Sequence, residues 1–105
     1  MYDENVTVGI LSSITDIDGV AVELIVAPNP TEDVFTFELK NWPSSENFIS
    51  VEILDINGKL VQNRVVGKYD DRFLGTFSLM KYPDGLYFVR VIHPTANLLE
   101  KIIKQ

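Results

Sequence analysis

Chemically reactive side chains are scarce in this chain of 105 residues. His93 is the single histidine, and cysteine is absent. A Ser-His-Asp arrangement would therefore depend on His93 alone, and a zinc site would lack the set of His and Cys ligands that zinc normally takes. Because His93 stands next to Pro94 where a strand-like segment ends, we interpret it as a surface turn residue. We predict no catalytic, metal or cofactor site.

Two acidic stretches have residue types that could hold a metal ion or act as an acid–base pair. The sequence "DIDG" (16–19) begins like a calcium-binding loop, but no glutamate follows at the spacing that would complete the loop. In "YDDR" (69–72), adjacent carboxylates on a strand would point to opposite faces and could not act together. We interpret the first stretch as a linker and the second as a solvated turn, and we expect no enzymatic activity.

Four aromatic residues could instead form a platform for sugar rings. They are Trp42, Tyr69, Phe73 and Tyr82, of which only Trp42 lies clearly in a loop. Aromatic side chains are also the usual filling of a small β-core. A carbohydrate-binding or fibronectin-III-like accessory module of a surface enzyme is therefore an alternative interpretation of the chain.

Composition limits the possible partners further. Fifteen acidic residues against nine basic ones give a net charge of −6, so we expect no nucleic-acid partner. No apolar run approaches the roughly 20 residues that span a bilayer, and we predict no membrane insertion. The first residues, "MYDENVTVGI", lack the basic and long apolar regions of a signal peptide. If the protein is exported, we expect that signal on residues outside this sequence.

Alternation of apolar and polar residues dominates the chain and predicts strands. The segments with this pattern are 20–27, 34–40, 48–55, 59–66, 73–80 and 85–93. The segment 85–93 is apolar on both faces, which is typical of a central strand. The apolar residues of "LLEKIIKQ" (98–105) fit a helical face, but the segment is short and follows a turn-like "HPTAN". We favour a strand there and leave a helical turn open.

The connecting segments agree with an all-β chain. Asn57-Gly58 lies between two predicted strands and favours a type I′ hairpin turn, with positive φ at both residues. In "VAPNPTEDVF" (26–35), Pro28 and Pro30 cannot donate to a sheet, so this segment is predicted to be a rigid corner. The fold class that follows is an Ig-like antiparallel β-sandwich of about seven strands. "VTVGIL" in residues 1–19 could be a strand, and "SSITDIDG" has the composition of a polar linker.

Three parts of the chain resemble one known family when they are taken in order. They are "APNPTEDVF" (27–35), "VEILDINGKLV" (51–61), and "YPDGLYFVRV" (82–91) followed by "LLEKIIKQ". Residues 20–105 resemble the type A C-terminal sorting domain of proteins exported by the type IX (Por) secretion system. The positions that match its motifs are Pro28, Asn29, Pro30, Asn57, Gly58, Lys59, Gly85, Tyr87, Val89, Val91, Lys101, Ile102, Ile103 and Lys104.

The resemblance implies a function as well as a fold. Such domains are Ig-like β-sandwiches that follow a larger cargo and pass with it through the periplasm to the outer-membrane surface or the medium. They are commonly removed by a sortase-like peptidase, which joins the cargo to an anionic lipopolysaccharide. The implied partners are the translocon, that peptidase and an N-terminal cargo domain, and residues 1–19 would be a linker or the end of the cargo region. Unpaired strand edges also make a homodimer possible.

The terminal segment is the part that the translocon would recognise according to this resemblance. We hypothesise that residues 98–104 form an exposed edge strand that docks by strand addition. In this hypothesis Lys101 and Lys104 set the electrostatics of the strand.

Overall fold

The computed structural model describes residues 9–43, 45–94 and 96–105. In these residues, every helix or strand assigned is a β-strand. No helix in these ranges is long and apolar enough to cross a membrane. The all-β prediction is confirmed, with one strand more than the seven expected. The strands are β1 (Gly9–Ile17), β2 (Val20–Asn29), β3 (Val34–Lys40), β4 (Phe48–Leu54), β5 (Leu60–Tyr69), β6 (Arg72–Ser78), β7 (Gly85–His93) and β8 (Ala96–Lys104).

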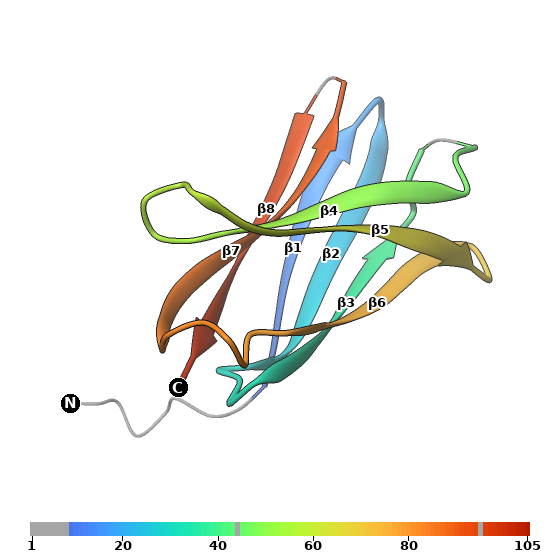
Figure 1. The fold of residues 1–105 in the computed structure, drawn as a ribbon. Coiled ribbons are helices and arrows are strands. Elements are labelled where there is room, and N and C mark those ends of the chain that lie inside the picture. The colour runs from blue at the N-terminus through green and yellow to red at the C-terminus, as the bar shows by residue number, and fades with distance from the viewer. Residues whose placement is uncertain (1–8, 44, 95) are drawn as a thin grey trace.

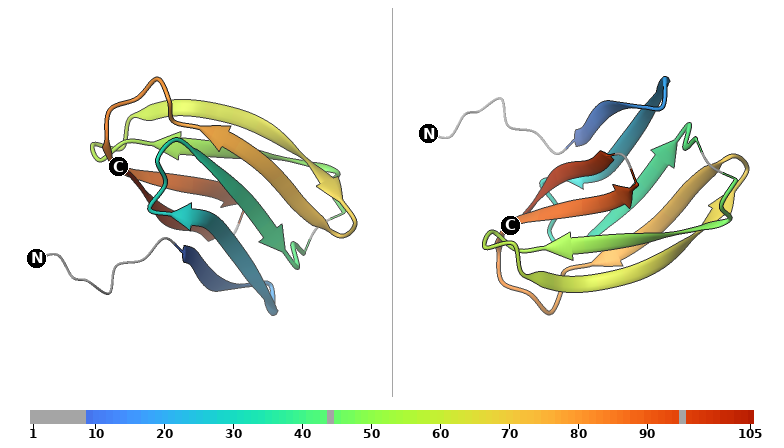
Figure 2. Two further views of the ribbon diagram at one scale, coloured as in Figure 1. Left: turned by 90° about the horizontal axis from the view of Figure 1, so that it is seen from below. Right: turned by 90° about the horizontal axis from the view of Figure 1, so that it is seen from above.

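One continuous antiparallel sheet folds over to make two layers (Figures 1 and 2). The strand order is β1-β2-β3-β6-β5-β4-β7-β8. β5 pairs with β4 over most of its length, but it pairs with β6 only through Lys68 and Tyr69. The sheet therefore turns its corner at the end of β5, and the layers β1-β2-β3-β6 and β5-β4-β7-β8 enclose the core.

The core contains the residues that the alternating pattern placed on the inner faces. Phe35 and Phe37 of β3 are fully buried, and the Phe77 ring stacks on Phe35 with centroids 5.5 Å apart. The other strands add aliphatic side chains, because one residue in two faces the opposite layer. These are mainly Val22, Leu24, Val26, Ile49, Val51, Ile53, Val89, Val91, Leu98 and Ile102.

The C-terminal segment is a strand, as we favoured. β8 pairs with β7 without a break from Ala96 to Lys104, and β7 also pairs with β4. Leu98 and Ile102 are buried, whereas Leu99 and Ile103 are 50% and 38% exposed. The helix-like spacing of these four apolar residues thus reflects a strand with one buried and one half-exposed apolar face.

The polar linker expected at "SSITDIDG" is wrong, because these residues are the second half of β1 and its turn into β2. β1 pairs with β2 up to Ile17, which is buried, and Asp18 and Gly19 form the turn with φ of 52° and 80°. The Asp-Gly pair is a strong hairpin signal. The second half of the strand before this turn was not predicted, because Ser13 and Thr15 on the inner face of β1 are polar and interrupt the apolar–polar alternation that indicates a strand.

The β4–β5 hairpin is present, but its turn is not type I′. Only Gly58 has positive φ, at 81°, and its N–H donates to the Asp55 carbonyl at 2.9 Å. One carboxylate oxygen of Asp55 also accepts the N–H groups of Asn57 and Lys59, both at 2.9 Å. Because the Asp55 side chain makes these bonds, the turn residues before Gly58 keep negative φ. A two-residue turn with positive φ at both positions occurs instead at Asp70-Asp71, which confirms "YDDR" as a turn.

Gly58→Val tests the backbone requirement at this turn. No atom lies within 4 Å of an added Cβ, so the cost is conformational rather than a clash. We expect a loss of at least about 1–2 kcal/mol in the free energy of unfolding, the cost of a left-handed conformation for a residue with a Cβ. Chemical denaturation measures it. Gly58→Asn is the control and should cost less, since asparagine tolerates this conformation, and equal stability of all three proteins would contradict the assignment.

Candidate functional site

The segments that match the sorting motifs come together at one end of the sandwich. The Pro28–Pro30 corner lies against the end of β8, and β8 pairs with β7. Asp55 of the β4–β5 turn lines a cavity with Gly85 and Tyr87 of β7. Residues far apart in the sequence therefore form one composite site.

The Asn29 side chain fastens the last strand to the rest of the domain. Its Nδ2 donates to the Lys101 carbonyl at 2.8 Å, and its Oδ1 accepts the Ile103 N–H at 3.1 Å. Asn29 is 6% exposed, so water competes little for these bonds. The backbone of Thr31 continues the contact, because its N–H donates to the Ile103 carbonyl and its carbonyl accepts the Gln105 N–H. We call these four bonds the Asn29–Thr31 latch.

The latch covers much of the edge that β8 was hypothesised to offer for strand addition. In an antiparallel ladder both backbone groups of a residue point to the same side. The latch bonds show that this side is outward for Lys101 and Ile103, so the unbroken register makes it outward for Asn97 and Leu99 as well. β8 is an edge strand as predicted, but its C-terminal half is already paired. β1 lies next to β8 (Figure 1), but no hydrogen-bonded ladder joins these two strands in the described residues.

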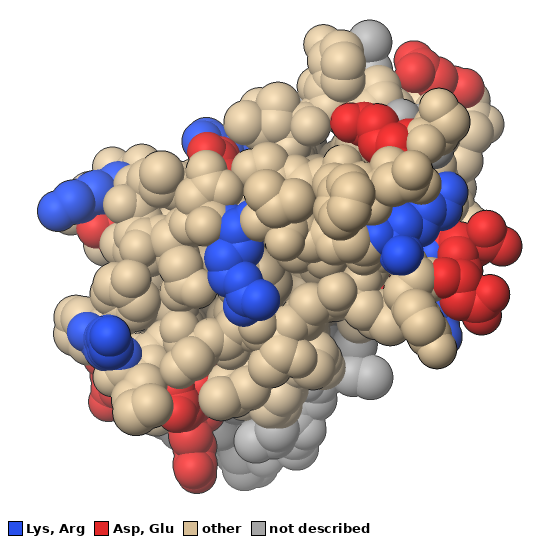
Figure 3. All heavy atoms as spheres, turned by 45° about the vertical axis from the view of Figure 1, so that its right-hand side comes forward, with Lys and Arg blue, Asp and Glu red and all other residues tan. Residues whose placement is uncertain are grey.

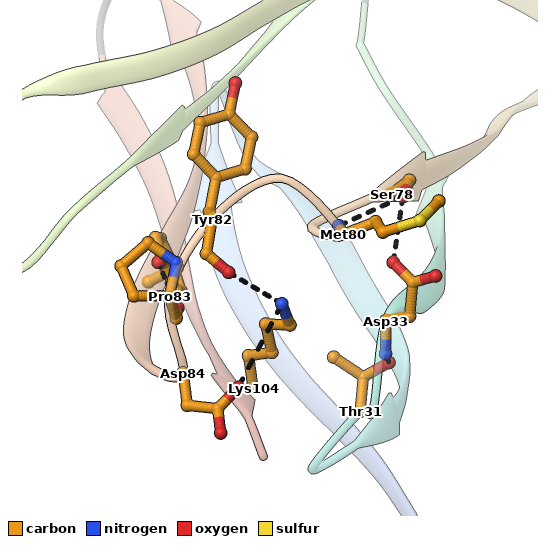
Figure 4. A network of polar contacts seen from close by, with 9 residues as sticks. Thr31, Asp33, Ser78, Met80, Tyr82, Pro83, Asp84 and Lys104 are labelled. Carbon is orange, nitrogen blue, oxygen red and sulfur yellow. Dashed lines mark hydrogen bonds and ion pairs between the residues drawn. The ribbon is translucent and has the colours of Figure 1, made fainter.

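The two lysines of the terminal segment have different environments. Lys101 is exposed on the outside of β8. Only 10% of the Lys104 side chain is exposed, and its Nζ donates to the Tyr82 carbonyl at 2.6 Å and lies 4.0 Å from Asp84 Oδ1 (Figure 4). Lys104 therefore anchors the 79–84 loop, and Lys101 is the terminal lysine whose charge is exposed to solvent.

A second set of polar contacts joins residues 31–34 to Ser78 and Leu79, where the 79–84 loop begins (Figure 4). Thr31 Oγ1 donates to the Val34 carbonyl at 2.6 Å and accepts the Asp33 N–H at 3.2 Å. Asp33 Oδ1 accepts the Ser78 hydroxyl at 2.9 Å, and the Asp33 carbonyl accepts the Leu79 N–H at 2.8 Å. These bonds fix the two loops on either side of the C-terminal strand.

Tyr87 connects β7 to the loop that precedes it. Its ring is buried, and its hydroxyl donates to the Pro83 carbonyl. Burial raises the pKa of the Tyr87 hydroxyl, and the carboxylates of Asp55 and Asp84 raise it further. The hydroxyl therefore stays protonated and keeps donating over a wide pH range.

The sequence-predicted motif residues divide into buried and presented groups. Asn29, Pro30, Tyr87, Val89, Val91 and Ile102 are buried, and Lys104 is largely covered, so these residues hold the fold. The exposed ones are Pro28, Asn57, Gly58, Lys59, Gly85, Lys101 and Ile103. Sequence reasoning missed Thr31, Asp33 and Asp55, although Asp55 stands two residues before Asn57, where a side-chain turn is common.

His93 and Phe73 are part of the packed structure and not of an exposed site. His93 was expected on the surface, but it is only 9% exposed, its ring lies edge-on to Trp42 at 5.1 Å, and its Nε2 is 3.9 Å from Asp18 Oδ2. Phe73 is buried in the core, so the four aromatic residues do not form one exposed platform. No group of three or more His, Cys, Asp or Glu suited to a metal ion occurs in the described parts of the chain.

Charged side chains are mixed on the face shown in Figure 3. Lysines and arginines occur in separate groups, several of which have acidic residues beside them. Among the described residues of that face there is no continuous basic area of the kind that tracks a phosphate backbone.

Asn29→Ala tests the latch. The change leaves the Lys101 carbonyl and the Ile103 N–H without partners, so we expect the free energy of unfolding to fall by about 2–4 kcal/mol. Hydrogen exchange at the Ile103 amide should also become faster. Asn47→Ala at an exposed position is the control. Unchanged exchange at Ile103 would mean that Asn29 does not hold the strand.

The pKa of Tyr87 predicts how stability depends on alkaline pH. Because the folded pKa lies above the unfolded value of about 10, the folded state holds its proton more tightly. The free energy of unfolding should therefore decline as pH rises above about 10 towards the folded pKa. Denaturation series from pH 8 to pH 11 should show a shallower decline for Tyr87→Phe. Identical slopes for the two proteins would refute this role of the hydroxyl.

Comparison with known proteins identifies the family of the chain. The family model described as "Secretion system C-terminal sorting domain" matches residues 25–105, which include every motif position. No curated protein and no solved structure matches the chain. The chain thus belongs to the C-terminal sorting domains of type IX secretion, the cargo tails that engage the secretion machinery for export to the cell surface or the extracellular space.

Proposed function

We propose that residues 20–105 are a non-catalytic label that the type IX translocon recognises in its folded form. The observation that supports this most is the Asn29–Thr31 latch, which joins the first and last motifs of the family through hydrogen bonds of the buried residues Asn29 and Thr31. A linear signal would need no such bonds. A label that depends on shape needs its terminal strand held in one position.

In this proposal the label follows an N-terminal cargo domain, which it accompanies from the periplasm across the outer membrane. A sortase-like peptidase then separates the two and attaches the cargo to the cell surface. We place residues 1–19 on the cargo side of the boundary. Although β1 extends the sheet, it lies before the matched residues 25–105.

A reporter fusion tests the proposal. The whole chain, residues 1–105, is placed behind a reporter with a Sec signal, and a second fusion lacks residues 98–105. The first reporter should reach the medium or the surface only in cells with a working type IX machine. The second should stay in the periplasm, because β8 and the latch are gone. Retention of the complete fusion in competent cells, or export of the truncated one, would end this proposal.

A further inference from the structure

Alternate side chains of β7 and β8 point away from the core and take no part in its packing. Six of them form what we call the outer face, which consists of Leu86, Phe88, Arg90, Leu99, Lys101 and Ile103. The register places Leu86 opposite Ile103, Phe88 opposite Lys101, and Arg90 opposite Leu99. Leu99 and Ile103 are 50% and 38% exposed, so two apolar side chains flank Lys101 on its own strand.

A shallow groove adjoins the outer face and could receive an apolar side chain. Its volume is about 310 Å³, and its walls include Leu54, Ile56, Phe88 and Leu99. Ile56 is 69% exposed and comes from the turn that carries the Asn57-Gly58-Lys59 motif. The groove therefore connects the middle motif with the two terminal strands.

Charge on the outer face favours an anionic group on the partner. Arg90 is already paired with Glu52 at 2.6 Å. Lys101 takes part in none of the ion pairs found among the described residues, although the chain carries a net charge of −6. A carboxylate that approaches Lys101 between Leu99 and Ile103 would be shielded from water, which strengthens the attraction. A single free cation suits one carboxylate better than a polyanion, which needs several.

The edge of β8 is a weaker candidate for recognition than its outer face. The latch occupies the outward backbone groups from the Lys101 carbonyl to the Gln105 N–H, and β1 lies next to β8. A second copy of this chain is also disfavoured on the outer face, because both copies would carry the same net charge. A different protein is the occupant that these observations favour.

We propose that the outer face binds a protein surface that places an apolar side chain in the groove and a carboxylate against Lys101. The proposal rests on the proposed sorting function and names the chemistry of the partner in it. Apolar contact and one shielded ion pair together give both affinity and selectivity.

Secretion of the reporter fused to residues 1–105 provides the test. Leu99→Ser and Lys101→Glu should each lower the secreted fraction about tenfold, equivalent to about 1.4 kcal/mol of binding free energy. Lys101→Arg should retain secretion. Leu74→Ser, at a 40% exposed leucine on β6, and Lys68→Glu, at an exposed lysine on β5, are matched controls and should behave as the unchanged protein. Thermal unfolding of the purified variants checks that each is folded.

Competition supplies a second measurement. Domain 1–105 without a reporter, overproduced in the periplasm, should reduce secretion of the fusion, and its Leu99→Ser and Lys101→Glu variants should not. If these variants are secreted and compete like the unchanged domain, the outer face is not the binding surface. If light scattering shows a dimer that Leu99→Ser dissociates, the occupant is a second copy and the proposal is overturned. If the unchanged fusion were also secreted by cells without a working type IX machine, the proposed sorting function itself would be wrong.

Discussion

The side chain of Asn29 makes the contacts that a neighbouring strand would make, and the terminal site depends on it. A carboxamide has the same donor and acceptor groups as a peptide unit, so it pairs with the Lys101 carbonyl and the Ile103 N–H at once. Pro28 and Pro30 on either side have no N–H groups that would need partners in this crowded corner. A buried asparagine is stable only when its polar atoms are satisfied, so the corner and the end of β8 require each other.

This constraint separates the residues that build the domain from those that a partner can contact. Tyr87, Val89, Val91 and Ile102 fill the core, and Lys104 holds the loop before β7. Similarity to the family at these positions therefore reflects the fold. The residues between them on the same strands face outward and are free to carry recognition, because alternate residues of a strand lie on opposite faces.

The sequence was sufficient for the core but insufficient for the polar contacts. Period-two alternation located β2, β3 and β4, because apolar residues at every second position of a strand face the core. It did not show which face of β7 is buried, since that segment is apolar on both faces. The latch joins residues more than 70 positions apart, so no local signal predicts it. The second half of β1 was missed because polar Ser13 and Thr15 lie on its inner face, and the β4–β5 turn was misassigned because Asp55 changed its type. His93 was misplaced because an adjacent proline indicates a strand end and says nothing about burial.

A label of this construction has an energetic advantage over a flexible tail. Ordering a disordered segment on binding costs about 1–2 kcal/mol per residue in backbone entropy, or about 5–10 kcal/mol for the stretch from Leu99 to Ile103. In the folded domain that cost has been met by pairing with β7 and by the latch, so contacts with a partner contribute directly to affinity. The same coupling makes recognition depend on folding, since an unfolded chain would not hold Leu99, Lys101 and Ile103 in one row. Selective recognition of correctly folded domains would then need no separate checking step.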